Sequence, residues 1–442
     1  MWRRRRRPVW RCWGVLSEGR ADCWSLTFAV VTGENGTGAG DSAGVMSGEG
    51  PMKQLLISVC VLLCSVAALV LASYFSVRPT GVSQVSADAV LAADDASKVP
   101  AQQLQYPAKD DPRLQGMLWI PGGVYTMGAA DSFPDEFPPH SVQLDGFWMD
   151  ETEVTNRQFA AFVQATGYVT LAEQPPKLRS VQSGAGVSDA DILPDLNKPG
   201  SICSLQLSNR GDIDPSKGAY SWWQYVPGAS WRHPEGPESS IDERQDHPVV
   251  HVSWPDAVAY CRWAGKELPT EAQWEYAARG GRAGEMYPWG QDRNPEGRWL
   301  HNIWQGEFPI EDTGADGFRR TAPVGSFPAN AFGLRDISGN VWEWCADYYQ
   351  PDYYEACVVQ GGGRPLRNPR GPETSFDPQE PGIVKRVQRG GSFMCSDQYC
   401  IGYRTTARMK GEEDSGAFHT GFRCVINGRP VAVQPESSDQ GH

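Results

Sequence analysis

Two cysteines near the C-terminal end of the chain, Cys395 and Cys400, are the residues best suited to chemistry; they stand in RGGSFMCSDQYCIGYR. Their spacing puts the side chains about 140° apart on a helix and on opposite faces of a strand, so the thiols meet only across a turn. Two meeting thiols form either a short-loop disulfide or a metal or redox pair, and the spacing leaves both open. A thiolate pair suits a soft ion of low coordination, such as Cu(I), better than tetrahedral zinc.

Two other motifs are weaker candidates for a functional site. His247 and His251 stand in HPVVH, whose spacing is that of two metal ligands on one helix turn. Pro248 and the β-branched valines favour an extended segment instead, so we expect no metal site there. Trp222 and Trp223, in YSWWQYVPG, either line a peptide groove or fill the core.

Composition narrows the class of protein. The 442 residues include 40 Lys and Arg against 53 Asp and Glu, a formal charge of −13, so nucleic acid is not an expected partner. The 48 Gly, 34 Pro and 17 Trp predict a loop-rich globule packed with aromatic side chains, and they argue against a disordered chain or a long helical bundle.

The N-terminal part is predicted to be an appendage. Residues 1–52 show no apolar periodicity and are predicted to be an unstructured extension, and because Met46 and Met52 are alternative start positions, this extension is either translated or not translated. The run LLISVCVLLCSVAALVLASYF, from Leu55 to Phe75, is uncharged and long enough to span a bilayer. Its length favours an uncleaved anchor over a cleaved signal, with the rest of the chain exported.

Four segments follow from this reading. They are a transmembrane signal-anchor over 53–75, a linker over 76–113, one large domain over 114–427 and a disordered tail over 428–442. We therefore expect an exported, membrane-anchored protein whose domain is extracytoplasmic, in a periplasm or a lumen.

The domain is predicted to be α+β with much irregular structure. Capping residues and terminal glycines mark three helices, from Thr155 or Asn156 to Gly167, from Ser253 to Gly265 and from Thr270 to Gly280. Alternating apolar residues mark strand-like pieces at Met117–Gly128 and Val142–Asp150.

Cysteine pairing cannot be complete in the domain. Its seven cysteines are Cys203, Cys261, Cys345, Cys357, Cys395, Cys400 and Cys424. Since the number is odd and export implies an oxidising compartment, at least one thiol stays unpaired or binds something.

A series of segments resembles the formylglycine-generating enzymes, the oxidases that mature sulfatases. In order along the chain they are WIPGGVYTMG, FWMDETEVTNRQFAAFV, WRHPEGPESSI, HPVVHVSWPDAVAYCRWAGKELPTEAQWEYAARGG, NIWQGEFP, GLRDISGNVWEW, RVQRGGSFMCSDQYC and GFRC. The resemblance covers residues 114–427. It implies the family's single loop-rich domain with a C-type-lectin-like fold, low secondary-structure content and stabilisation by calcium.

The cysteine pair separates the oxidases from relatives of other function. By the resemblance, Cys395 and Cys400 bind Cu(I) as a bis-thiolate and admit the substrate thiol as a third ligand. Molecular oxygen is the co-substrate, and the cysteine of a Cys-x-Pro-x-Arg motif in a sulfatase precursor becomes Cα-formylglycine. Ser392, Tyr399 and Trp342 match positions that line the site, although core packing would equally explain the two aromatic residues.

Two calcium sites are also implied by the resemblance. The first matches Asn302, Ile303, Asp316 and Phe318, and the second matches Asp336, Gly339, Val341 and Glu343. Half of these positions offer only backbone carbonyls, which a hard cation accepts.

The resemblance further implies a disulfide between Cys261 and Cys424. A second family bridge is missing, because its positions hold Ala278 and Thr405. Cys203, Cys345 and Cys357 stay unassigned, and a local pairing of the last two is open.

The expected partner is an unfolded or extended segment of a sulfatase precursor, bound by a monomer. Two alternatives differ in class. A calcium-stabilised peptide- or glycan-binding module would hold Cys395 and Cys400 as an inert disulfide, and an iron-dependent oxygenase would ignore replacement of Cys395.

Overall fold

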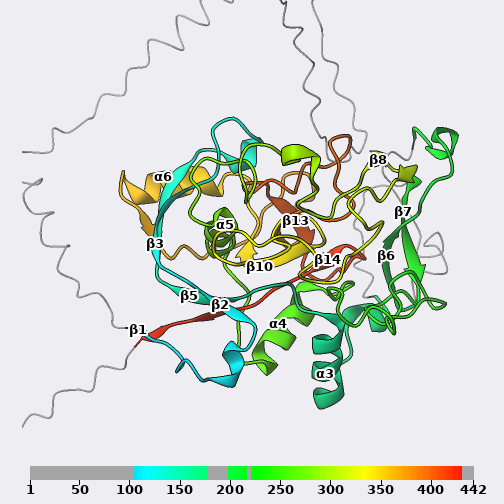
Figure 1. Ribbon diagram of the computed structural model, residues 1–442, viewed down its shortest axis with the longest axis horizontal. Coiled ribbons are helices and arrows are strands. Elements are labelled where there is room, and N and C mark those ends of the chain that lie inside the picture. Colours follow the sequence, from blue (N-terminus) through cyan, green and yellow to red (C-terminus); the bar gives the residue numbers. More distant parts are fainter. Residues whose placement is uncertain (1–103, 177–197, 217–220, 431–442) are drawn as a thin grey trace, which may run out of the picture. The chain divides into compact units, whose positions relative to one another are not determined.

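The structure of the protein is a computed structural model that describes residues 104–176, 198–216 and 221–430 (Figure 1). Other residues lie outside this description, including the predicted extension 1–52, the predicted anchor 53–75, most of the linker 76–113 and most of the tail 428–442. Of the helices in the described ranges, none has the length and apolar character needed to cross a membrane.

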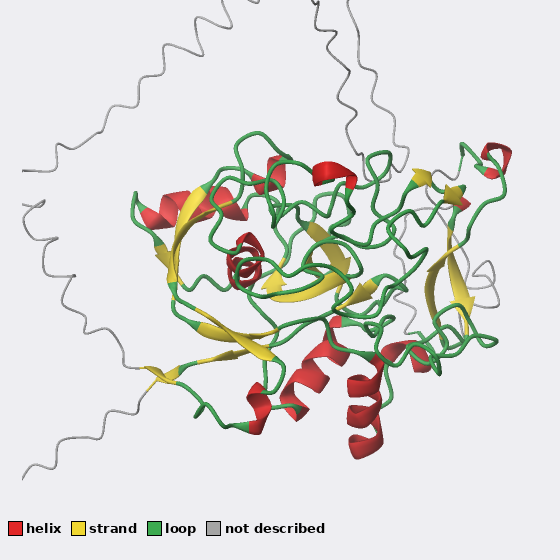
Figure 2. Cartoon of the chain, viewed as in Figure 1, coloured by secondary structure: helices red, strands yellow, loops and turns green. Residues whose placement is uncertain are grey.

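Short strands form six small sheets among the described residues, and loops make up much of the rest (Figure 2). The largest sheet has the order β13 (Met409–Glu412), β12 (Lys385–Arg389), β10 (Trp342–Tyr348) and β14 (Thr420–Gly421). A second sheet has three strands in the order β11 (Leu366–Arg367), β4 (His140–Leu144) and β3 (Gly123–Met127). A third sheet has three strands in the order β15 (Val425–Asn427), β5 (Phe147–Asp150) and β2 (Met117–Ile120). Three further pairs are β1 (Leu104–Gln105) with β16 (Arg429–Pro430), β6 (Gly200–Ser204) with β7 (Trp223–Pro227), and β8 (Gly306–Glu307) with β9 (Glu311–Asp312).

The described α-helices are α3 (Asn156–Thr166), α4 (Trp254–Trp263), α5 (Glu271–Arg279) and α6 (Tyr353–Gly361). The first three confirm the predicted helices, because Thr155, Ser253 and Thr270 each form a capping box at the N-cap. The sequence did not predict α6, whose N-cap Asp352 makes no side-chain capping bond. Single turns of 3₁₀ helix stand at Pro112–Leu114, Pro134–Glu136, Leu171–Glu173, Arg210–Asp212 and Pro295–Gly297.

Each predicted strand-like piece becomes two strands. The piece Met117–Gly128 divides into β2 and β3, and Val142–Asp150 divides into β4 and β5. β2 pairs with β5 and β3 with β4, so one antiparallel ribbon bends and continues into a second sheet. The bend needs Gly122, because a Cβ there would lie 2.6 Å from the Leu144 carbonyl oxygen.

The fold extends past both predicted boundaries. Leu104 pairs with Pro430 across β1 and β16, so the folded region begins before Leu114 and continues past Asn427. The contact joins residues at opposite ends of the domain, which local sequence patterns do not reveal.

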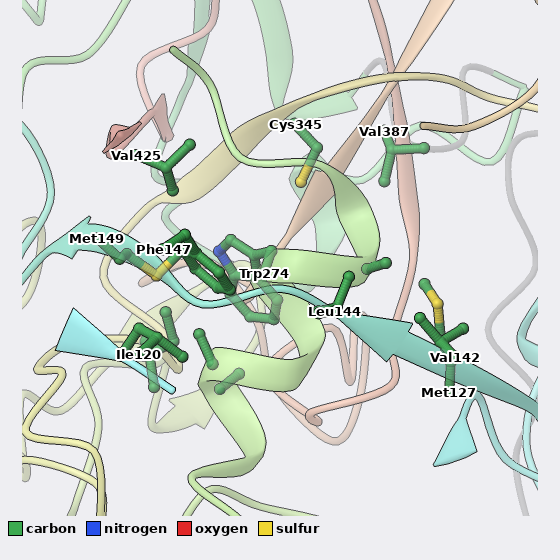
Figure 3. Packing of buried hydrophobic residues seen from close by; sticks show 14 of the residues in the cluster. Ile120, Met127, Val142, Leu144, Phe147, Met149, Trp274, Cys345, Val387 and Val425 are labelled. Carbon is green, nitrogen blue, oxygen red and sulfur yellow. The ribbon is translucent and has the colours of Figure 1, made fainter. Parts of the chain in front are cut away.

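The main core surrounds α5 (Figure 3). Trp274 on this helix is fully buried against residues of the strands around it, including Phe147 and Met149. Charged groups lie on the same helix: Arg389 donates to Glu271 at 2.8 Å and to Glu275 at 2.7 Å, and all three are buried. Arg408 and Arg279 complete this buried network by pairing with Glu271 and Glu275.

Ionisation of the buried Asp347 carboxyl lowers the stability of this core as the pH rises. Burial, and then the nearby Glu271 carboxylate, raises the pKa of Asp347 to about 7. An unfolded Asp titrates near ~3.9, so the stability that neutral Asp347 gives is present below that pH and is lost as the pH rises through 7. Asp347→Asn keeps the acceptor for the Glu271 amide, 2.8 Å away. In urea denaturation we expect it to raise the free energy of unfolding by at least about 1 kcal/mol above pH 7 and to change little near pH 4. An equal change at both pH values would contradict this account.

Candidate active site

The two cysteines of the predicted site meet across a turn, as the spacing predicted. The sulfurs of Cys395 and Cys400 lie 2.9 Å apart. The Cys400 amide closes the turn by donating to the Ser396 carbonyl at 2.9 Å. Cys395 is buried and Cys400 is partly exposed, so one thiol faces solvent more than the other.

A double glycine sets up this turn. β12 ends at Arg389, and Gly390 and Gly391 follow with φ of +94° and +76°. A Cβ on Gly391 would lie 2.6 Å from the Tyr403 amide nitrogen, so the chain needs glycine there. Ser392 then accepts the Cys395 amide at its carbonyl, 2.8 Å away, and holds the cysteine in place.

A cavity of about 580 Å³ opens beside the thiols. The five residues predicted to be catalytic all line it, namely Trp342, Ser392, Cys395, Tyr399 and Cys400. The structure thus brings the predicted set together, from β10 and from the loop after β12. Its wall also includes residues that the sequence did not single out, among them Met394, Asp377, Arg408 and His419.

Tyr399 lies in an aromatic wall. Its ring stacks on Phe308 with centroids 4.3 Å apart and planes 5° from parallel, and Trp222 packs edge-on at 5.6 Å. The Trp223 indole donates to the Tyr399 hydroxyl at 3.2 Å. Burial raises the pKa of Tyr399 to about 12, so the phenol is neutral at physiological pH. Trp223 lines the cavity and also packs against the buried cluster that contains Phe418, so both interpretations of the tryptophan pair stay open.

Phe308 is the aromatic residue that sequence reasoning missed. It follows β8, and the segment containing it lies near β6 and near β7, the strand that carries Trp223 (Figure 1). The amide of Leu207, after β6, donates to the Pro309 carbonyl, 3.4 Å away. The block NIWQGEFP contained this residue, but only the fold shows that it stacks on Tyr399.

Trp342 reaches the thiols because residue 402 is glycine. A Cβ on Gly402 would lie 2.3 Å from the Trp342 ring and 3.1 Å from the Cys400 sulfur. Gly402→Ala therefore displaces the ring or the thiol. We expect a loss of about 1–3 kcal/mol in unfolding free energy, together with at least about tenfold slower turnover.

The matched control for this change is Gly361→Ala in α6, where the nearest atom to a new Cβ is 3.9 Å away. Urea denaturation and steady-state kinetics on both variants measure the difference. Equal behaviour of the two variants would show that the close approach at Gly402 is unimportant.

The donors at the turn suit a soft metal ion. Two sulfurs converge there, and thiolates are the ligands that Cu(I) prefers. Hydrogen bonding to Cys395, followed by burial, raises the pKa of Cys400 well above its ordinary value. Within the described ranges, no group of three or more His, Cys, Asp or Glu side chains forms a metal cluster.

The first predicted calcium set is gathered in one place. Asp316 accepts the amides of Ile303 and Phe318 at 3.0 and 2.9 Å, and burial raises its pKa to about 6. The side-chain oxygen of Asn302 is buried with no hydrogen-bond partner in the described chain. A carboxylate, an orphaned amide oxygen and backbone carbonyls fit a hard cation.

The second calcium set has a different charge arrangement from the predicted one. Glu343 forms a bidentate pair with Arg423, both N–O distances being 2.7 Å, so its role as a calcium ligand stays a prediction. Glu153, which the sequence did not single out, is fully buried, and one of its oxygens has no partner in the described residues. Burial, and then Asp336, raises the pKa of Glu153 well above its ordinary value. The carboxyl groups of Glu153 and Asp336 thus act electrostatically on Arg423, which is ion-paired only with Glu343 among the described residues, and a bound cation would favour their charged forms.

The two sites adjoin. Asn302 of the first set forms a parallel bridge with Gly339 of the second, and a Cβ on Gly339 would lie 2.3 Å from the Asn302 carbonyl oxygen.

The remaining cysteines are separate thiols in the structure. Cys261 and Cys424 lie with their sulfurs 3.4 Å apart, so the implied disulfide stays a prediction. Cys203, Cys345 and Cys357 are buried thiols.

The HPVVH segment is not helical, as expected. His251 is buried and contacts the Pro234 carbonyl at 2.8 Å, whereas His247 contacts the Thr321 hydroxyl at 2.9 Å.

A family model and the curated proteins named below match most of this chain. Residues 102–428 match the family described as the sulfatase-modifying factor enzyme 1-like domain. A protein of Thermomonospora curvata named formylglycine-generating enzyme is 46% identical over 321 residues, covering 71% of this chain and 94% of that protein. The formylglycine-generating enzyme of Bos taurus is 44% identical over 318 residues, covering 71% and 75%. A Mus musculus protein named inactive C-alpha-formylglycine-generating enzyme 2 is 37% identical over 332 residues, covering 72% and 91%. Among solved structures, PvdO from Pseudomonas aeruginosa aligns with a TM-score of 0.44 at 24% identity, covering 74% of this chain and 99% of that one.

Proposed function

The chain belongs to the sulfatase-modifying factor enzyme family, and on that premise we propose that it is a formylglycine-generating oxidase. Its substrate is the cysteine of a Cys-x-Pro-x-Arg motif in an unfolded segment of a sulfatase precursor, and its product is Cα-formylglycine. Family membership alone does not decide activity, because a relative named inactive also matches. The observation that carries the proposal is the thiol pair of Cys395 and Cys400 beside a cavity of about 580 Å³.

The reaction replaces a thiol carbon by an aldehyde carbon. The substrate Cβ loses one of its two hydrogens, its bond to sulfur breaks, and the sulfur leaves as hydrogen sulfide. With O2 as oxidant, one oxygen atom enters the aldehyde and the other leaves as water. The balance needs two more electrons and two protons, which a thiol reductant supplies as it is oxidised to a disulfide.

Copper is part of the proposal. Cys395 and Cys400 would hold Cu(I), which when bound supplies one-electron chemistry with O2 and a position for the substrate thiolate. Trp342 packs in one hydrophobic cluster with the two cysteines, and the Ser392 carbonyl accepts the Cys395 amide. The neutral Tyr399 phenol keeps its proton in the cavity, because the aromatic wall buries it.

Calcium is proposed for the two adjoining sites that contain Asn302 and Asp336. The first site lies beside the catalytic loop, because the amide of Trp304, next to Ile303, donates to the Cys395 carbonyl at 2.9 Å. Bound calcium would hold these loops in place of a regular sheet. Calorimetry of chelator-treated protein tests this role, since returning calcium should raise the unfolding midpoint.

Membrane anchoring and export are proposed from the sequence. The uncharged run from Leu55 to Phe75 supports an anchor that leaves the domain on the exported side. We also propose that the protein acts as a monomer.

The test is a mass-spectrometric assay of the full chain with a Cys-x-Pro-x-Arg peptide, O2, Cu(I) and a thiol reductant. The expected product is a peptide aldehyde, formed only when copper and oxygen are both present. Copper-loaded protein that consumes no oxygen and forms no aldehyde would overturn the proposal in favour of a binding module.

A further inference from the structure

A second pocket, of about 390 Å³, adjoins the thiol cavity, since Met394 lines both. We call it the arginine pocket, after Arg244, Arg319 and Arg320 in its lining. The aromatic residues Trp304, Phe393 and Phe418 form its apolar part. A mixed lining of this kind suits a ligand with both a charged end and an apolar stem.

The charge of this pocket is positive, although the whole chain is acidic. Arg244 pairs with both oxygens of Glu235, at 2.7 and 3.0 Å, and Arg320 lies 3.5 Å from the same carboxylate. Asp312 accepts the backbone amides of Gln305 and Gly314. The three guanidinium groups therefore exceed the two carboxylates by one positive charge.

Arg319 is the one of the three arginines that Glu235 does not hold, and it interacts only electrostatically with Asp312. Within the described part of the chain, no hydrogen bond or ion pair holds its guanidinium, and the residue is exposed at the pocket. Its charge is thus available to an incoming anion.

Trp304 supplies a second, independent observation. The residue is only 8% exposed, and its indole nitrogen is buried with no acceptor among the residues that the structure describes. A buried N–H without an acceptor costs free energy that a ligand oxygen would recover. The backbone amide of Trp304 donates to the Cys395 carbonyl, so this donor is carried on the segment that contacts the catalytic loop.

We infer that the arginine pocket binds a carboxylate side chain of the client polypeptide, an Asp or Glu that flanks the reacting cysteine. The inference rests on the proposed function, because it makes the client the source of the carboxylate. Arg319 and the Trp304 indole supply the donors, and the aromatic part packs on the methylene groups of the acidic side chain. The contact between the pocket and the thiol cavity at Met394 makes one polypeptide segment able to occupy both.

The test measures binding without turnover. Fluorescent peptides carry serine in place of the reactive cysteine and a single Glu at successive flanking positions, with Gln at the same positions as the reference. We expect Glu to tighten binding to the full chain by about threefold to tenfold at one or two positions, and the gain to shrink as salt rises. Arg319→Gln should remove the gain.

The matched control is Arg367→Gln, because Arg367 is a partly exposed arginine on β11 that lines neither cavity. This variant should keep the preference for Glu. No preference at any position, or a preference that survives in Arg319→Gln, would overturn the inference.

A further arm separates the sources of the anion. Sulfate added at constant ionic strength should compete with the Glu peptides and not with the Gln peptides. Sulfate that perturbs tryptophan fluorescence while the peptides show no preference would assign the pocket to a free anion and would overturn the inference. Aldehyde formation without a Glu preference defeats this inference alone, whereas a Glu preference without aldehyde defeats the proposed oxidase alone.

Discussion

Cys395→Ser is expected to lower aldehyde formation by at least about 10³-fold, and Cys400→Ser by a similar factor. The two thiols lie 2.9 Å apart and act as one unit, so losing either removes the soft donor pair. A serine hydroxyl fills the same space but is a poor ligand for Cu(I). Mass-spectrometric turnover, with copper binding measured on the same samples, gives both readouts.

Cys203→Ser is the matched control. Cys203 is also a buried thiol, its sulfur lies 3.6 Å from the Pro234 carbonyl oxygen, and a serine hydroxyl can donate to that oxygen as well. This variant should keep its turnover and its copper. If Cys395→Ser retained a tenth of the wild-type rate, the thiol pair would not be the reacting centre.

Arg389→Met is expected to destabilise the fold by about 3–5 kcal/mol. Arg389 is fully buried and donates to Glu271 and Glu275, and its loss leaves both buried carboxylates short of a partner. Arg408 and Arg279 still pair with them, which places the effect at the lower end of that range. Urea denaturation followed by tryptophan fluorescence measures it.

A surface ion pair provides the contrast. Arg367 pairs with Asp145 at 2.9 Å but is 46% exposed, so Arg367→Met should cost less than about 1 kcal/mol. Similar losses for the two arginine variants would show that burial of the network does not decide its contribution.

Local patterns predicted the parts of the fold that local interactions determine. The helix beginning at Thr155 was predictable because its capping box and the terminal Gly167 lie within the helix itself. The spacing of Cys395 and Cys400 showed that their thiols could meet only across a turn, and the structure contains that turn. By contrast, the pairing of β1 with β16 and the contact of Arg389 with Glu271 join distant segments, and no short-range pattern encodes them.

The site was predictable to the same extent. The family resemblance predicted the cysteine pair together with Trp342, Ser392 and Tyr399. The fold brings Trp342 and Ser392 to the same cavity as the cysteines. Phe308 was missed because stacking on Tyr399 depends on how a loop after β8 meets the loop after β12. The arginine pocket was missed for a similar reason, since Arg244 and Arg319 come from separate loops.

The pairing of β1 with β16 also bears on how this domain can be combined with other proteins. Because the strands are antiparallel and Leu104 faces Pro430, the entry and exit points of the domain lie side by side. A domain with adjacent ends can be inserted into a surface loop of another protein without separating the two ends of that loop. It can also be circularly permuted, with its original ends joined and new ends made in another loop. The paired ends therefore make this domain suited to insertion into other proteins and to circular permutation.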